Sequence, residues 1–165
     1  MEVTIRELRK DEYPQLTDFL YEAIFVPPGT PKPERAVVHE PELQVYVENF
    51  GTGIADFALA AEVEGGLVGC AWTRIMIDYG HLDEQTPSLA IAVFEQYRGR
   101  GIGTKLLKTL LIQLQESGYS QVSLSVQKAN YAAQLYQKLG FQIVKENAEE
   151  WIMAVTLNPK KKETL

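Results

Sequence analysis

Residues 98–104 form a glycine-rich turn that reads Arg98, Gly99, Arg100, Gly101, Ile102, Gly103 and Thr104. An apolar run at residues 89–94 precedes the turn, and leucines recur at helical spacing after it, which predicts a buried strand and then an amphipathic helix. Glycines let the backbone approach an anion closely, and the first N–H groups of a helix have no acceptor inside the helix. The turn therefore predicts a cradle for phosphate groups, with added contacts from Thr104 and from Arg98 or Arg100.

The spacing of the glycines excludes two common nucleotide-binding motifs. A Walker P-loop has four residues between its first glycine and a Gly-Lys-Ser/Thr sequence, and the register from Gly99 to Lys105 does not provide this. A dinucleotide-binding turn has two residues between its second and third glycines, whereas one residue separates Gly101 from Gly103. Because such a turn can also serve only to connect a strand to a helix, a second signal is needed.

The rest of the chain mixes strands and helices without an internal repeat. Apolar runs predict strands at residues 3–8, 57–63, 67–77, 89–94, 122–126, 141–144 and 151–157. Apolar residues at helical spacing predict helices at residues 11–24, 41–50, 102–117 and 130–139, with Asp11 and Asn130 as N-caps. Since no βαβ unit repeats, the predicted class is α/β or mixed α+β.

Length and charge limit the classes of protein. The chain has 165 residues, of which 45% are hydrophobic and 23% are charged, and this fits a single globular domain. We assign residues 1–159 to that domain and residues 160–165 to a basic, solvated tail. The formal net charge of −6 repels nucleic acid and mildly favours a cationic substrate.

The composition also bears on location and on metals. The first residues lack the apolar core of a signal peptide, and no run approaches the ~20 apolar residues that span a bilayer. The single cysteine, Cys70, lies in an apolar run, where a packed thiol is expected rather than a nucleophile. We therefore expect a cytoplasmic protein without a membrane partner, and the lack of a Cys and His cluster predicts no metal.

A second motif occurs further along the chain. Residues 130–141 begin with Asn130, carry Tyr136 near their centre and end in Gly140 and Phe141. With the turn at residues 98–104, this order and spacing resemble the two signatures of the GNAT superfamily of N-acetyltransferases, and the resemblance covers about residues 4–157. It implies a central, mostly antiparallel, twisted sheet of about seven strands with a V-shaped splay, flanked by about four helices.

The resemblance also implies a cofactor and its site. Acetyl-coenzyme A would lie in the splay, with its pantetheine arm along the backbone of Ile91, Ala92 and Val93, its diphosphate on residues 98–104, and a further contact from Asn130. Tyr136 corresponds to the general acid of the family, which also borders the cofactor. An unperturbed phenol, with a pKa of about 10, is a weaker acid than a thiol at about 8.5, so it can donate to the departing thiolate without being ionised itself.

The acceptor site and the general base are less well marked. Relatives bind the acceptor between the N-terminal helices and the far side of the splayed strands, a region that here offers Tyr21, Phe25, Tyr46, Trp72, Arg74, Tyr79 and His81. Residues 85–89, which approach the central strand, contain no carboxylate. Asp83 and Glu84 precede them in a loop, where solvated turn residues are expected. The sequence therefore assigns no base.

The function that these patterns favour is transfer of an acetyl group from acetyl-coenzyme A to a primary amine by direct attack in a ternary complex. Residues 124–141 are similar to ribosomal-protein N-terminal acetyltransferases, which favours a peptide N-terminus, whereas the proline-rich loop at residues 27–33 favours a different pocket for a small amine. The alternatives are a non-catalytic acyl-coenzyme A sensor and transfer to oxygen or of longer acyl groups. Homodimers are common in the family.

Overall fold

The computed structural model describes residues 1–159, so the basic tail assigned to residues 160–165 lies outside the described residues. Within the described chain, seven strands form one sheet: β1 (Thr4–Glu7), β2 (Phe57–Val63), β3 (Gly66–Arg74), β4 (Ser88–Val93), β5 (Gln121–Gln127), β6 (Gln142–Glu146) and β7 (Glu150–Thr156). The same residues include the α-helices α1 (Leu16–Ala23), α2 (Pro41–Gln44), α3 (Ile102–Glu116) and α4 (Ala132–Lys138). Short 3-10 helices lie at Lys10–Gln15, Arg35–His39 and Glu95–Tyr97.

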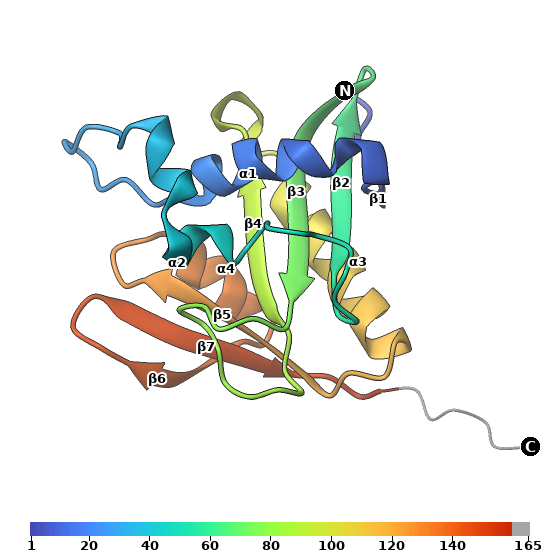
Figure 1. Ribbon diagram of the computed structural model, residues 1–165, viewed down its shortest axis with the longest axis vertical. Coiled ribbons are helices and arrows are strands. Elements are labelled where there is room, and N and C mark those ends of the chain that lie inside the picture. The colour runs from blue at the N-terminus through green and yellow to red at the C-terminus, as the bar shows by residue number, and fades with distance from the viewer. Residues whose placement is uncertain (160–165) are drawn as a thin grey trace, which may run out of the picture.

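The strands follow the order β1-β2-β3-β4-β5-β7-β6, and only the β4–β5 pair is parallel among the described strands. That pair meets at a single register position, Ser88 opposite Ser123. Beyond it, β5 and β7 turn away from the upright strands β2 to β4, as Figure 1 shows. The predicted mixed fold with a mostly antiparallel, splayed sheet is confirmed.

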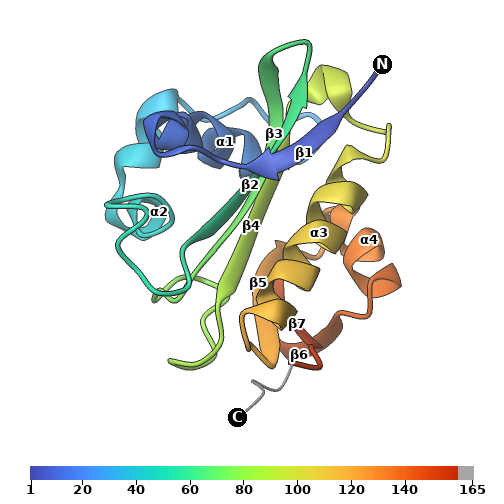
Figure 2. The same cartoon turned by 90° about the vertical axis from the view of Figure 1, so that its right-hand side faces the viewer.

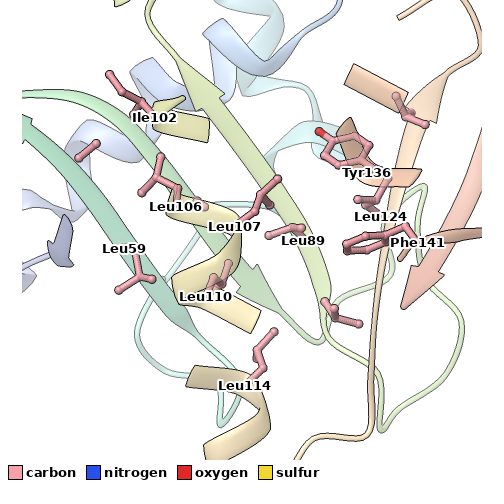
Figure 3. Packing of buried hydrophobic residues seen from close by; sticks show 14 of the residues in the cluster. Leu59, Leu89, Ile102, Leu106, Leu107, Leu110, Leu114, Leu124, Tyr136 and Phe141 are labelled. Atoms are coloured by element: carbon pink, nitrogen blue, oxygen red, sulfur yellow. The ribbon is translucent and has the colours of Figure 1, made fainter. Parts of the chain in front are cut away.

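Helices cover both faces of the sheet. Figure 2 shows α1 and α2 on one face and α3 and α4 on the other. Side chains alternate along β4, so Leu89, Ile91 and Val93 belong to the core under α3 and α4, while Ala90 and Ala92 belong to the core under α1. The leucine stripe of α3 inserts into the first of these cores, as Figure 3 shows, and its Leu106, Leu107, Leu110 and Leu114 have no exposed surface.

The first helical segment differs from the prediction. Asp11 is not an N-cap, because the chain enters a 3-10 turn at Lys10 and the regular helix begins only at Leu16. The carboxylate of Glu12 organises this turn, since it accepts hydrogen bonds from the backbone N–H of Arg9 and from the guanidinium of Arg6, each at 2.8 Å. The charged side chain therefore sets the start of the segment.

Two other predicted elements are too long. The helix predicted at residues 41–50 ends at Gln44, and the following turns include Asn49, whose φ of 53° is left-handed. The strand predicted at residues 67–77 ends at Arg74, whose guanidinium binds Asp56 and the carbonyl groups of Val45 and Glu48. These bonds join segments far apart in sequence, which local periodicity does not register.

The Arg6–Glu12 ion pair should make the free energy of unfolding depend on pH in the acid range. Hydrogen bonding to Arg6 lowers the pKa of Glu12 from 4.5 to about 2, although burial opposes the shift. A lowered folded-state pKa means that the pair stabilises the protein above about pH 4.5 and loses that contribution as the pH falls toward 2. We expect Glu12→Gln to reduce the free energy of unfolding at pH 7 by about 1–3 kcal/mol.

Urea denaturation between pH 7 and pH 3 measures this effect. The stability of Glu12→Gln should vary less with pH in this range than that of the wild type. Asp11→Asn is the matched control, because Asp11 is exposed and its only ion pair within residues 1–159, with Arg9, is a long one at 3.7 Å. Equal pH dependence for the wild type and Glu12→Gln would contradict the prediction.

Candidate active site

The splay leaves part of the β4 edge without a strand partner. Polar backbone groups alternate sides along a strand, and the Phe94 N–H donates to Val68 of the β3 side at 2.9 Å. The N–H and C=O groups of Ile91 and Val93 therefore face the opening toward β5, whereas those of Ala92 face β3. This placement corrects the expectation that all three residues present backbone groups to an arm bound in the opening.

The turn at residues 98–104 leads from this edge into α3. Gly99 and Gly101 have left-handed φ values of 75° and 79°, and a Cβ on either would meet no atom within 4 Å. Glycine is thus required by the backbone conformation and not by crowding. Gly101 is the N-cap of α3 and no side chain caps the helix, so the N–H groups of its first turn stay available. A Cβ on Gly103 would make only ordinary contacts, the nearest with Ile91 at 3.9 Å.

The two arginines of the turn have different environments. Nε of Arg98 donates to the Val93 carbonyl oxygen at 2.8 Å, and its Nη2 donates to Glu22 of α1 at 2.9 Å. Arg98 thereby ties the turn to the end of β4 and to α1. Arg100 is exposed, with its guanidinium carbon 5.7 Å from the centre of the Tyr97 ring. Nη1 of Arg100 donates to Met1 Sδ at 3.2 Å, and the rest of this exposed guanidinium and the half-buried Thr104 are open to an anion.

Tyr136 lies on α4, on the same side of the sheet as Leu89 and Ile91. Figure 3 shows its ring beside Phe141 and its hydroxyl group pointing away from Phe141. Burial raises the pKa of Tyr136 to about 12. The phenol is therefore a weaker acid than its unperturbed pKa implies, and it stays protonated across the neutral range. A phenol in this state can donate a hydrogen bond without being ionised.

The side chain of Asn130 accepts a hydrogen bond at the start of α4. Its Oδ1 accepts a hydrogen bond from the backbone N–H of Ala132 at 2.9 Å, although the residue in the N-cap position is Tyr131. Asn130 and Lys128 line a surface hollow beside the start of the helix. The predicted capping contact is thus present, displaced by one position.

The residues predicted to form the acceptor site do not all lie together. Trp72 has no exposed surface, and its Nε1 donates to the Tyr46 carbonyl oxygen at 3.0 Å. Trp72 is therefore a core residue, and Arg74 is held in the contacts described above. The hydroxyl of Tyr21 donates to the Pro33 carbonyl oxygen at 2.5 Å and so fastens the proline-rich loop. The half-buried Phe25 follows α1 at the start of that loop.

Tyr46, Tyr79 and His81 do lie in one region, at the closed end of the splay. Tyr46 is 8% exposed and Tyr79 is 50% exposed. Burial is the main reason that the pKa of each phenol is raised, and nearby carboxylates add to it. Nδ1 of His81 bonds the Met76 carbonyl oxygen at 2.8 Å, which fixes the ring within the β3–β4 loop.

That loop covers the point where β4 and β5 diverge. Ser88 Oγ donates to Asp78 Oδ1 at 2.8 Å, and Ser123 Oγ donates to the Gly80 carbonyl oxygen at 2.7 Å. A Cβ on Gly80 would approach the backbone of Leu124 and Ser125 to 3.0 Å, so any larger residue would require that backbone to shift by a few tenths of an ångström. Sequence reasoning did not single out Asp78, because the overlong predicted strand placed it at a strand end.

Residues 1–159 lack two kinds of structural feature. This part of the chain has no helix of the length and apolarity that a bilayer crossing requires. It also has no group of three or more His, Cys, Asp or Glu side chains arranged to hold a metal ion.

Comparison with known proteins agrees with this geometry. A family model described as an acetyltransferase (GNAT) domain matches residues 55–143, and the chain therefore belongs to the GNAT acetyltransferase family. Acetyl-coenzyme A is the co-substrate of this family.

Among curated proteins, the chain is 42% identical over 94 residues to an N-alpha-acetyltransferase of Sulfurisphaera tokodaii, covering 52% of this chain and 56% of that protein. It is 43% identical over 63 residues to the [ribosomal protein bS18]-alanine N-acetyltransferase of Haemophilus influenzae, covering 38% of this chain and 42% of that protein. The chain spans about half the length of the curated relatives it matches.

Solved structures share the fold. One is the PaiA N-acetyltransferase of Thermoplasma acidophilum in complex with coenzyme A, with a TM-score of 0.70, 17% identity and coverage of 94% of this chain and 99% of that one. Another is the ribosomal-protein-S18-alanine N-acetyltransferase of Escherichia coli, with a TM-score of 0.67, 21% identity and coverage of 99% of both chains.

Proposed function

We propose that this protein transfers an acetyl group from acetyl-coenzyme A to a primary amine, by direct attack of the amine in a ternary complex. The observation that carries the proposal is the splay that begins after the Ser88–Ser123 pair, because it leaves the backbone groups of Ile91 and the N–H of Val93 on an open strand edge, the Val93 carbonyl being bound by Arg98. An extended amide-containing arm can pair with such an edge as an added strand does. The opening leads directly to the uncapped start of α3.

Acetyl-coenzyme A supplies the activated acyl thioester when bound. The N–H groups at the start of α3, together with Arg100 and Thr104, would hold the diphosphate. The Ile91 and Val93 edge would align the arm, and a backbone N–H that faces the opening can stabilise negative charge on the thioester oxygen. Tyr136 would donate to the sulfur as the acyl group leaves, since its raised pKa keeps the proton on the phenol.

The nature of the acceptor rests on two considerations. The net charge of −6 and the carboxylates of Glu42 and Glu150, which act on Tyr79 at the closed end of the splay, favour a cationic amine. The relatives named as N-alpha-acetyltransferases support a peptide N-terminus, and small amines remain in the same proposal. A cytoplasmic location and a homodimer are further proposals, from the composition and from the family respectively.

The proposal is tested by measuring the release of free thiol from acetyl-coenzyme A in the presence of different acceptors. The panel of acceptors contains N-terminal peptides, polyamines, amino sugars and simple primary amines. We expect turnover with at least one amine, with a product whose mass is increased by one acetyl group. Preference for the peptides would assign the acceptor class to polypeptide N-termini.

Calorimetry with coenzyme A on the same preparation separates the alternatives. Binding of coenzyme A without turnover of any amine would replace the enzyme with a non-catalytic acyl-coenzyme A sensor. The absence of both binding and turnover would remove the basis of either function.

A further inference from the structure

A carboxylate without a cationic partner lies at the closed end of the splay. Asp78 is half-buried, and its Oδ1 accepts the hydrogen bond from Ser88, the fully buried β4 residue that pairs with β5. Among residues 1–159, no lysine, arginine or histidine forms an ion pair with Asp78. A partly buried carboxylate without a counter-charge is further stabilised when a cationic group binds beside it.

Hydroxyl groups orient this carboxylate. Tyr46, from the segment after α2, interacts through its hydroxyl with Asp78 and with Ser125 of β5. Ser88 and Ser125 lie on the strands that diverge, one on each side of the opening. The group formed by Tyr46, Asp78, Ser88 and Ser125 therefore spans the base of the splay, and we call it the apex cluster.

The apex cluster and Tyr136 lie on opposite faces of the sheet. Tyr136 packs with Leu89 and Ile91 on the α3 and α4 side, whereas Tyr46 packs in the core that includes Ala92 on the α1 side. The separation of the helix pairs is visible in Figure 2. A thioester held in the opening thus has a phenol on one side and a carboxylate on the other.

We propose that Asp78 is the catalytic base, which binds the ammonium group of the acceptor and removes its proton, and that Ser88 and Tyr46 are positioning residues for its carboxylate. This inference rests on the proposed acetyltransferase function. The acceptor approaches from the α2 side, past the exposed side chains of Ile77 and Tyr79, which suit an amine carried on a partly apolar body.

The proposed step balances in protons and electrons. One ammonium proton passes to an Asp78 carboxylate oxygen, directly or through one water molecule, which leaves a lone pair on nitrogen. The lone pair forms a C–N bond with the thioester carbonyl carbon, and the C–S bond breaks with its electron pair on sulfur. Tyr136 gives its proton to the thiolate and is reprotonated by the second proton lost from nitrogen, while Asp78 returns its proton to solvent. The products are the amide, the free thiol and one proton.

The electrostatics agree with this role. Burial raises the pKa of Asp78, while the hydrogen bonds from Ser88 and Tyr46 and from the backbone N–H groups of Gly80 and of Asp78 itself oppose the rise. The other titratable groups of this region are Tyr46, which bonds Asp78, His81, whose backbone N–H donates to the Asp78 carbonyl oxygen, and Tyr79, on which Glu40, Glu42 and Glu150 act. A raised pKa brings a carboxylate closer to the operating pH, which makes it a better base. The base is active when deprotonated, so activity falls as the pH drops through this pKa.

The test compares Asp78→Asn with Asp83→Asn, an exposed acid of the same loop. Asparagine retains an oxygen that can accept the Ser88 hydrogen bond but does not accept a proton. For the best amine of the panel, we expect kcat/KM of Asp78→Asn to fall by about 100-fold or more, with coenzyme A affinity unchanged. The acidic limb of its pH profile should also disappear. Asp83→Asn should behave as the wild type.

Ser88→Ala gives an independent readout that does not require Asp78→Asn to fold. Loss of the Ser88 donor raises the pKa of Asp78, so the acidic limb of kcat/KM should move to higher pH. An unmoved limb, or full activity of Asp78→Asn, would overturn the assignment of Asp78 and leave the acetyltransferase function intact. A wild type that binds acetyl-coenzyme A but acetylates no amine would overturn both.

Discussion

Replacement of Tyr136 by phenylalanine is expected to lower kcat by about 10²–10⁴-fold, the range for loss of a positioned proton donor. The hydroxyl is the only group removed, and the ring still packs beside Phe141 at a centroid distance of 5.9 Å. The fold and the affinity for coenzyme A should therefore stay close to those of the wild type. The defect should appear in the chemical step, with equal losses in kcat and kcat/KM.

Two measurements make this prediction specific. Tyr119→Phe is the matched control, because Tyr119 follows α3 and packs against Phe57, with ring centres 6.3 Å apart, away from the opening. It should retain full activity. Because burial raises the pKa of Tyr136 to about 12, ionisation of this phenol should cause no loss of wild-type activity between about pH 7 and 10. Unchanged kcat in Tyr136→Phe would remove the residue from the mechanism.

The strands and the long helix were predictable because their signals are local. The leucine stripe of α3 identifies both the length of the helix and its buried face, and the glycines at 99 and 101 mark the left-handed turn before it. The two family signatures, at residues 98–104 and 130–141, then predict that Tyr136 lies near the opening beside β4. Sequence reasoning therefore singled out the turn, the β4 edge and Tyr136, which are the residues now proposed to bind coenzyme A.

The acceptor side was not predictable in the same way, since it depends on contacts between distant segments. Tyr46 meets Asp78 only because α2 stops at Gln44 and the chain turns back over the sheet. Asp78 reaches Ser88 only because β3 ends early and its loop folds over the diverging strands. No local apolar pattern marks the early end of α2 or of β3. Trp72 was predicted to contact the acceptor because its burial depends on tertiary packing, which the local sequence does not show.

A negative charge in the turn at residues 98–104, where the diphosphate is proposed to bind, should strongly weaken the binding of coenzyme A. Gly101→Glu should weaken coenzyme A binding by about 100-fold or more, because it places a carboxylate at the N-terminus of α3 where a diphosphate is proposed to bind. Like charges in contact cost several kcal/mol, and each 1.4 kcal/mol is about tenfold in affinity. A Cβ at this position meets no atom within 4 Å, so the new side chain does not disturb the core. Isothermal calorimetry with coenzyme A measures the loss.

The control for this substitution lies at the other end of the same helix. Gly118, like Gly101, has a left-handed φ, 93° against 79°, and a Cβ there also meets nothing within 4 Å. Gly118→Glu therefore introduces the same charge and a similar backbone strain of about 1–2 kcal/mol, but far from the start of α3. Both variants should melt at similarly reduced temperatures, while only Gly101→Glu loses coenzyme A. Equal affinities in the two variants would show that the start of α3 does not bind the diphosphate, and the opening beside β4 would then need another ligand.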